Sequence, residues 1–285
     1  MVIASVGIVG SGIMGSGIAE VAAKAGMDVV LRSRKQESAD AMVAGLERSL
    51  DRQVEKGRLE QGERDAIVAR VTATSTLADV AGCDLVLESV VEDLAVKKDL
   101  FNELDRVCKD SAIIATNTST LPVVEMAMET GRPEQVVGVH FFNPAPAMSL
   151  VEIVRPLTAS DETVAAVRAF AEACGKKPVE VKDRAGFVVN ALLFPYLNNA
   201  VRMLENGTAS AEDIDAAMQG GCNFPMGPLA LLDLVGLDTS VAILDALYDE
   251  FRDPNYSPVP LLRRMVSAGH LGRKTGRGFY GYASR

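Results

Sequence analysis

A glycine-rich turn between an apolar strand and a helix, near the start of the chain, constrains the fold more than any other feature. Val2–Val9 is a continuous apolar run, GSGIMG follows at residues 10–15, and Ile13–Ala25 has the periodicity of a helix. A second short apolar strand follows at residues 28–31. The order strand, helix, strand predicts a β-α-β unit with two parallel strands in one sheet.

The three glycines of this turn fit the G-x-G-x-x-G pattern of a dinucleotide-binding loop. The first glycine permits the tight turn, the second lets the backbone approach a pyrophosphate, and the third lets the helix pack on the strand. The helix N-terminus then faces the phosphates. The alternative is that the glycines only ease packing. The residues expected to contact the dinucleotide are Gly10, Gly12, Ile13, Met14 and Gly15.

The end of the second strand lacks the acidic residue that usually binds the ribose. That residue is expected about 20 positions after the glycine motif, where this chain has Arg32, Ser33 and Arg34. A serine beside guanidinium groups can bind a 2′-phosphate, which a carboxylate would repel. We therefore expect NADP(H), NAD(H) or both as the cofactor. The alternative is that Arg34 and Lys35 are solvated residues and that NAD(H) still binds.

Short apolar runs alternate with helical stretches over the first two thirds of the chain. Strands that alternate with helices predict a doubly wound, mostly parallel sheet of Rossmann type in an α/β fold. The polar segment Ser38–Arg70, with Gly57 and Gly62 as breaks, indicates a helical hairpin inserted after the second strand. The further strands are expected at residues 71–74, 85–88, 112–116, 136–140, 150–154 and 178–181.

From Phe187 onward the pattern is helical only. Amphipathic segments cover residues 187–205, 210–218 and 229–247, with no strand-like alternation among them. A chain of 285 residues is long enough for one large domain and a smaller one. We expect a dinucleotide-binding domain at residues 1–184 and an all-α domain for substrate binding and dimerisation at residues 185–285.

Composition excludes several classes of protein. The formal net charge is −9 and there is no dense run of Lys and Arg, so we expect no nucleic-acid partner. No apolar run reaches the length of a membrane span, and the first residues lack a leader pattern, so we expect a cytoplasmic protein without a membrane partner. The four cysteines form no C-x-x-C pair, so we expect neither a metal site nor a disulfide framework.

His140 stands at the end of an apolar strand, on the sheet edge where ligands bind in open α/β folds. Its ordinary pKa near 7 suits a proton carrier. Glu152 lies in the apolar run LVEIV and could accept the second ring N–H of His140 if the intervening loop turns back. The spacing equally allows Glu152 to pair with Arg155 or a lysine on an exposed edge strand.

Ser119 follows the strand at residues 112–116, also at the carboxyl edge of the sheet. Its hydroxyl could bind a substrate oxygen. It could also cap the helix that begins near Pro122, which is the commoner role of a serine in such a loop.

Several motifs together give the chain a family resemblance over nearly its whole length. They are GSGIMG, NTSTL at 117–121, HFFNP at 140–144, VEI at 151–153, GFVVN at 186–190 and GRKTGRGFY at 272–280. With these motifs the chain resembles the L-3-hydroxyacyl-CoA dehydrogenase family, close to its bacterial 3-hydroxybutyryl-CoA members. HFFNP and the C-terminal motif are more specific than the glycine pattern.

The resemblance implies an oxidoreductase that interconverts (S)-3-hydroxyacyl-CoA and 3-ketoacyl-CoA, with an acyl-CoA substrate and a homodimeric state. It implies His140 as the acid/base, Glu152 as its orienting partner, and Ser119 and Asn190 as groups that bind the substrate oxygens. It implies further that the cofactor lies along Glu92, Lys97, Asn117, Asn143 and Lys274, and that coenzyme A contacts Ser49 and Lys56.

Three other functions share features with this sequence. The β-hydroxyacid dehydrogenases use a lysine in a G-x-x-x-N-x-x-K helix; Gly186 and Asn190 match, but Leu193 occupies the lysine position. A related dehydrogenase of a free hydroxy or sugar acid is a second alternative. A nucleotide-binding protein without turnover is a third, which His140, Glu152, Ser119 and Asn190 together disfavour.

Overall fold

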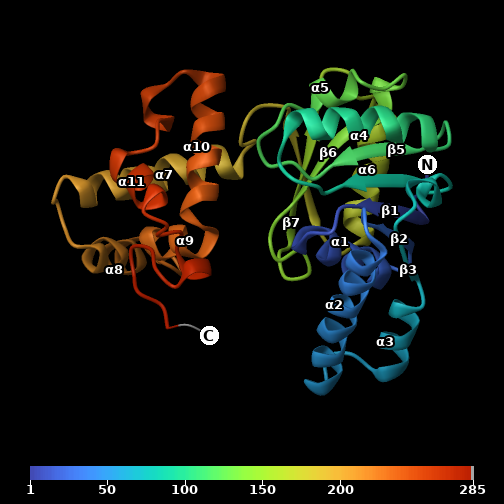
Figure 1. Cartoon of the computed structure of the whole chain (residues 1–285), viewed down its shortest axis with the longest axis horizontal. Helices are drawn as coiled ribbons and strands as arrows, with labels where there is room; N and C mark the ends of the chain where they lie inside the picture. Colours follow the sequence, from blue (N-terminus) through green and yellow to red (C-terminus); the bar gives the residue numbers. More distant parts are fainter. Residues whose placement is uncertain (284–285) are drawn as a thin grey trace. The chain divides into compact units, whose positions relative to one another are not determined.

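A computed structural model describes residues 1–283 and divides the chain into two compact units, Met1–Asp183 and a second that begins at Arg184 (Figure 1). From the sequence we expect the boundary after residue 184. The first unit is an α/β domain and the second is built of helices. The predicted fold class, a mostly parallel sheet with a helical C-terminal domain, is confirmed.

The first unit is built on one eight-stranded sheet with the order β3-β2-β1-β4-β5-β6-β7-β8. Strands β1 to β6 are parallel to their neighbours, β7 runs antiparallel to β6, and β8 is parallel to β7. The chain leaves β1 toward β2 on one side and returns to β4 on the other, so a ligand crevice is expected at the carboxyl ends of β1 and β4. The strands are β1 (Ser5–Val9), β2 (Asp28–Arg32), β3 (Val71–Thr74), β4 (Leu85–Glu88), β5 (Ile113–Thr116), β6 (Val136–Phe141), β7 (Leu150–Arg155) and β8 (Lys177–Lys182).

The predicted helical hairpin is present after β2 and extends beyond the sheet (Figure 1). Gly57 ends its first helix with a φ of 62°, which only glycine adopts readily. Gly62, expected as a second break, lies inside the second helix, which Glu60 and Glu63 begin with a capping box. The helices of the first unit are α1 (Ile13–Lys24), α2 (Gln36–Glu55), α3 (Gln61–Val68), α4 (Leu94–Val107), α5 (Val123–Ala127) and α6 (Asp161–Ala173).

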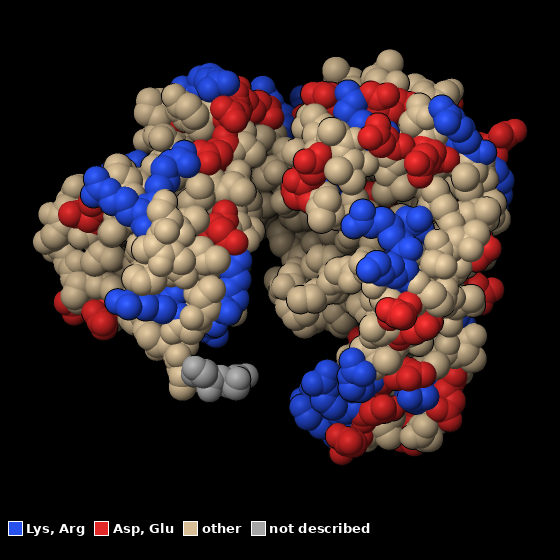
Figure 2. All heavy atoms as spheres, viewed as in Figure 1, with Lys and Arg blue, Asp and Glu red and all other residues tan. Residues whose placement is uncertain are grey.

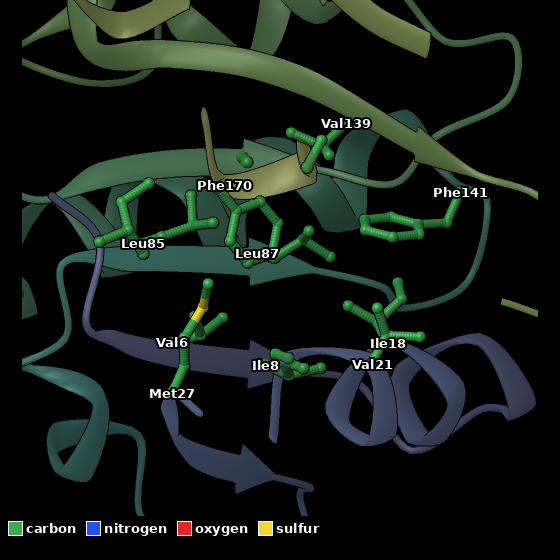
Figure 3. Close-up of a cluster of buried hydrophobic side chains, with 14 of the residues drawn as sticks. Val6, Ile8, Ile18, Val21, Met27, Leu85, Leu87, Val139, Phe141 and Phe170 are labelled. Carbon is green, nitrogen blue, oxygen red and sulfur yellow. The ribbon is translucent and has the colours of Figure 1, made fainter. Parts of the chain in front are cut away.

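The core of the first unit lies between the central strands and α1. Val6 and Ile8 of β1 and Leu85 and Leu87 of β4 are fully buried, and Figure 3 shows them in one apolar cluster with Ile18 of α1. Residues two apart in a strand face the same side of a sheet, so these pairs present one apolar surface to the helix. Burial of that surface holds the N-terminus of α1 at the carboxyl end of β1.

The second unit contains α7 (Val189–Glu205), α8 (Ala211–Cys222), α9 (Pro228–Val235), α10 (Leu237–Phe251) and α11 (Pro260–Ser267). The single helix expected at residues 229–247 is wrong. Gly236, with a φ of 104°, separates α9 from α10. The apolar periodicity continues across this break because both helices bury residues in the same core.

Buried carboxylates attach the C-terminal segment to these helices. Asp233, which is 1% exposed, accepts hydrogen bonds from the backbone N–H groups of Phe279 and Tyr280 at 2.9 and 3.0 Å. Asp215 accepts one from the Tyr280 hydroxyl at 2.8 Å. A Cβ at Gly278 would lie 1.8 Å from Asp233 Oδ1, so this position requires glycine. The GRKTGRGFY motif therefore has a structural role within the second unit.

Candidate active site

The three glycines of the turn after β1 serve different purposes. A Cβ at Gly10 would lie 2.1 Å from the Ser89 carbonyl oxygen, and one at Gly15 would lie 2.6 Å from the Gly10 carbonyl oxygen. Packing of the protein on itself therefore explains these two glycines. A Cβ at Gly12 would meet no protein atom within 4 Å. Gly12 leaves space at the N-terminus of α1, where no side chain caps the free backbone N–H groups, so the turn fits the phosphates of a dinucleotide.

A cavity of about 790 Å³ opens beside this turn, within the first unit. Such a volume is typical of small-molecule and cofactor sites. Gly10, Ser11 and Gly12 form one wall and the end of β2 contributes Arg32, Ser33 and Arg34. The opposite wall comes from the segment after β4 and from α4, and consists of Ser89, Val90, Val91, Val96, Asp99, Leu100 and Glu103.

The residues that follow β2 are fixed at the edge of this cavity by backbone hydrogen bonds. The Gly10 N–H donates to the Arg32 carbonyl at 3.0 Å, and the Ser33 N–H donates to the Thr74 carbonyl at 3.0 Å. Ser33 is 4% exposed. The buried Nε of Arg32 has no hydrogen-bond partner within residues 1–283. The end of β2 thus contributes one serine and two arginines to the lining of this cavity.

His140 and Glu152 face each other on adjacent antiparallel strands. The register pairs His140 of β6 directly with Glu152 of β7, and His140 Nδ1 lies 2.8 Å from Glu152 Oε2. The two side chains are 6% and 1% exposed, so water screens their interaction little. The Phe142 ring packs against the imidazole with 4.4 Å between ring centroids. A carboxylate in this position fixes the tautomer and the orientation of the imidazole.

The alternative partner for Glu152 is wrong. Arg155, which ends β7, forms ion pairs with Asp161 and Glu180 instead. The antiparallel return of the chain after β6, rather than the spacing of the two residues, brings Glu152 to the imidazole.

The loop after β5 is held by Glu92 from the neighbouring strand end. Glu92 Oε1 accepts hydrogen bonds from the Thr118 hydroxyl at 2.5 Å, the Ser119 N–H at 2.8 Å and the Ser119 hydroxyl at 3.3 Å. Burial raises the pKa of Glu92, but Lys97 and these hydrogen bonds outweigh it, so the pKa lies below its usual range. Asn117, in the same loop, accepts a hydrogen bond from the Phe141 N–H at 2.8 Å.

Ser119 does not cap the helix that follows. The first N–H groups of α5, those of Val123 and Val124, donate to the Asp183 carboxylate at 2.9 and 2.8 Å. The commoner role expected for this serine is therefore taken by Asp183, which lies 60 residues after Val123 in the chain.

Beneath this loop lies a buried ion pair that the sequence analysis missed. Lys97 Nζ is 2.7 and 2.8 Å from the two carboxylate oxygens of Glu88 and 3.3 Å from Glu92 Oε2. Lys97 is 1% exposed and Glu88 is fully buried; Glu88 also accepts a hydrogen bond from the Thr116 hydroxyl at 2.7 Å. The signal in the sequence is a glutamate that ends an otherwise apolar strand. Neither Glu92 nor Lys97 lines the cavity beside the glycine turn.

The other predicted site residues lie in four places. Asn143 follows β6 and is exposed. Ser49 lies in α2, and Lys56 is the C-cap residue that follows the end of this helix. In the second unit, Asn190 lies in the first turn of α7 and is 8% exposed. Lys274, in the same unit, forms an ion pair with Asp238 at 2.6 Å.

Within residues 1–283 no group of three or more His, Cys, Asp or Glu side chains could hold a metal ion. In the same part of the chain, none of the helices is both long enough and apolar enough to cross a bilayer.

Comparison with known proteins gives matches over nearly the whole chain. Residues 5–184 match the 3-hydroxyacyl-CoA dehydrogenase NAD binding domain, and residues 186–282 match the C-terminal domain of the same family. A 3-hydroxybutyryl-CoA dehydrogenase from Mycobacterium tuberculosis is 50% identical over 97% of this chain and 98% of its own length. A probable 3-hydroxybutyryl-CoA dehydrogenase from Bacillus subtilis is 44% identical over 100% of this chain and 99% of its own. The crystal structure of an (S)-3-hydroxybutyryl-CoA dehydrogenase from Ralstonia eutropha is similar with a TM-score of 0.96 and 44% identity, over 99% of this chain and 100% of that one.

Proposed function

Because this chain belongs to the 3-hydroxyacyl-CoA dehydrogenase family, we propose that it interconverts (S)-3-hydroxybutyryl-CoA and acetoacetyl-CoA with a nicotinamide dinucleotide. It is an oxidoreductase, since both domains of the family are present and together span residues 5–282. The observation that carries the proposed chemistry is the His140–Glu152 hydrogen bond of 2.8 Å at the carboxyl edge of the sheet.

In the proposed mechanism His140 moves the proton of the substrate alcohol. When bound, a nicotinamide would supply the hydride acceptor for C3 of the alcohol, or the hydride donor for C3 of the ketone. With Nδ1 engaged by Glu152, the proton exchange with the 3-hydroxyl falls to Nε2 of His140. Glu152 stabilises the imidazolium that forms in the oxidative direction. In the reductive direction the imidazolium gives its proton to the oxygen at C3.

Ser119 is the proposed hydrogen-bond donor to a substrate oxygen. Glu92 holds the backbone N–H of Ser119, which fixes the loop and leaves the hydroxyl with a longer contact of 3.3 Å that a substrate can replace. A donor held in place before the reaction stabilises charge on a carbonyl oxygen without reorganisation. The role of Asn190 toward the same oxygens, and that of Lys274 and Asn143 toward the cofactor, remain predictions.

We propose that the coenzyme A moiety binds at Ser49 of α2 and at Lys56, which follows the end of this helix. Lys and Arg side chains gather at the end of the α2–α3 hairpin (Figure 2), where Arg52, Lys56 and Arg58 are exposed. Coenzyme A carries several phosphate charges, so a local basic group on a chain of net charge −9 favours its binding.

We also propose that the protein works as a homodimer in the cytoplasm. Leu192, Met203, Phe224 and Leu234 of the second unit are between 41% and 72% exposed, and burial against a second copy would remove this apolar surface from water. Light scattering of the purified protein tests the assembly: a mass of one chain would refute the dimer.

The reaction is tested by the change in absorbance at 340 nm with acetoacetyl-CoA, and with free acetoacetate for the alternative that the substrate is a free acid. We expect turnover with the thioester and little with the free acid. His140→Ala and Glu152→Gln should lower kcat by about 10²–10⁴-fold, the usual contribution of a positioned acid or base, with little change in dinucleotide affinity. His270→Ala, which alters the only other histidine, is the matched control. Near-normal kcat in both site variants would refute the mechanism.

A further inference from the structure

The end of β2 carries groups that match a phosphate better than a ribose hydroxyl. We infer that Arg32, Ser33 and Arg34 form a binding site for the 2′-phosphate of the adenosine ribose, so that the enzyme binds NADP(H) more tightly than NAD(H). The inference deepens the proposed function, because it specifies which dinucleotide the site takes.

The first observation is the unsatisfied guanidinium of Arg32. Its Nε is buried and has no hydrogen-bond partner within the described part of the chain. Buried donors in folded proteins are nearly always paired, so a donor left unpaired beside a cavity indicates an acceptor that arrives with a ligand. The backbone of Arg32 is fixed next to the phosphate-binding turn by the 3.0 Å hydrogen bond from Gly10. A guanidinium there can make charge-assisted hydrogen bonds to phosphate oxygens.

The second observation is the chemistry of the two residues that follow. Ser33 is 4% exposed, with its backbone N–H bonded to Thr74, so its position is set by the sheet. It stands where a carboxylate would accept hydrogen bonds from a 2′-hydroxyl and repel a 2′-phosphate. Arg34 is exposed and lines the same cavity. Neither arginine forms an ion pair within residues 1–283, so both charges are available to a ligand.

Two carboxylates on the opposite wall oppose this preference. Asp99 and Glu103 of α4 line the cavity and are exposed, so the charges of the lining sum to zero. Position then decides the preference. The Gly10 hydrogen bond joins the glycine turn to Arg32, and Arg34 follows two residues later, whereas the two acids belong to the α4 wall with Val96 and Leu100. A phosphate on the ribose, which is attached to the turn through the pyrophosphate, therefore meets the arginines first.

The test measures binding without acyl-CoA, from the change in nicotinamide fluorescence when NADPH or NADH is added to the enzyme. We expect the wild type to bind NADPH at least about tenfold more tightly, since one charge-assisted hydrogen bond contributes this much. Arg32→Ala and Arg34→Ala should each weaken NADPH binding by about tenfold and NADH binding by less than about threefold. Ser33→Asp should reverse the preference.

Arg264→Ala, which removes an exposed arginine of α11, is the control and should change neither affinity. If Arg32→Ala does not fold, Arg32→Lys keeps the charge but loses the planar fork, and a smaller loss confined to NADPH is expected. NADH affinity equal to or above that of NADPH in the wild type would overturn the inference, as would equal losses for both nucleotides in the arginine variants. Failure of the proposed thioester reaction would leave these binding results unchanged.

Discussion

The buried ion pair between Lys97 and Glu88 offers a direct test of how the site loop is supported. Lys97→Met keeps the length and apolar stem of the side chain but removes the ammonium. Glu88 is then left fully buried, and among residues 1–283 its hydrogen-bond donors are the Thr116 hydroxyl and the Val90 N–H. Glu92 loses the cation that lowers its pKa, and with it part of its hold on Ser119.

The size of the effect follows from the burial of both charges. Removing one partner of a buried pair costs about 3–5 kcal/mol, because the other charge stays unpaired in a medium of low dielectric constant. For a domain of about 150–250 residues each kcal/mol lowers Tm by about 2–4 °C, so we expect a fall of roughly 6–20 °C. In the double variant Glu88→Gln/Lys97→Met no charge is stranded. The amide oxygen of Gln can accept the hydrogen bond from the Val90 N–H, and its NH2 can donate to the Thr116 hydroxyl, which accepts as well as donates. We expect that variant to recover more than half of the loss.

Differential scanning calorimetry of the wild type, the two single variants and the double variant completes the cycle. Lys98→Met is the matched control, because Lys98 pairs with Glu125 and Glu129 on the surface, where ion pairs contribute about 0–1 kcal/mol. A Tm loss for Lys97→Met no larger than that of Lys98→Met would refute the reasoning. So would a double variant whose loss equals the sum of the single losses.

Two further predictions concern the glycine turn and the response to acid. Gly12→Ala should leave Tm unchanged and weaken dinucleotide binding. Gly10→Ala should instead destabilise the fold, because its Cβ would lie 2.1 Å from a backbone oxygen and its φ is 142°. Calorimetry measures the effect on Tm and fluorescence titration the effect on binding; equal effects of the two variants on Tm would contradict the assignment. Burial raises the pKa of Asp84, but Lys109 and the N–H groups of Ala4 and Ser5 outweigh it and lower that pKa from 3.8 to about 2. The stabilisation is therefore complete above the ordinary pKa and is lost as the pH falls through about 2. Asp84→Asn should be less stable than the wild type near neutral pH and converge with it in acid denaturation curves; a constant difference down to the lowest pH would exclude this origin.

The local motifs of the sequence were sufficient to identify the family, and the comparisons with known proteins show the same family independently. These motifs could be found in the sequence because each lies within a few residues of chain. The GSGIMG turn is one such case, since strand periodicity before it and helix periodicity after it define its context. The hairpin at Ser38–Arg70 is another case, because apolar residues recur with the 3.6-residue period of a helix and a glycine with positive φ ends the first helix. The division between an α/β unit and a helical unit follows from the same change of period.

What the sequence alone determined is therefore the order of the elements, the glycine turn and the residues able to carry protons or charges. The tertiary structure decided which of these residues meet. The spacing alone would have allowed Glu152 to pair with Arg155. The antiparallel register of β6 and β7 instead places Glu152 opposite His140, and the two side chains form a hydrogen bond. Ser119 could have capped a helix, and Asp183 took that role from a distant position. The physical reason is that hydrogen bonds between strands and between loops join residues far apart in the chain, whereas periodicity reports only on neighbours within a few turns.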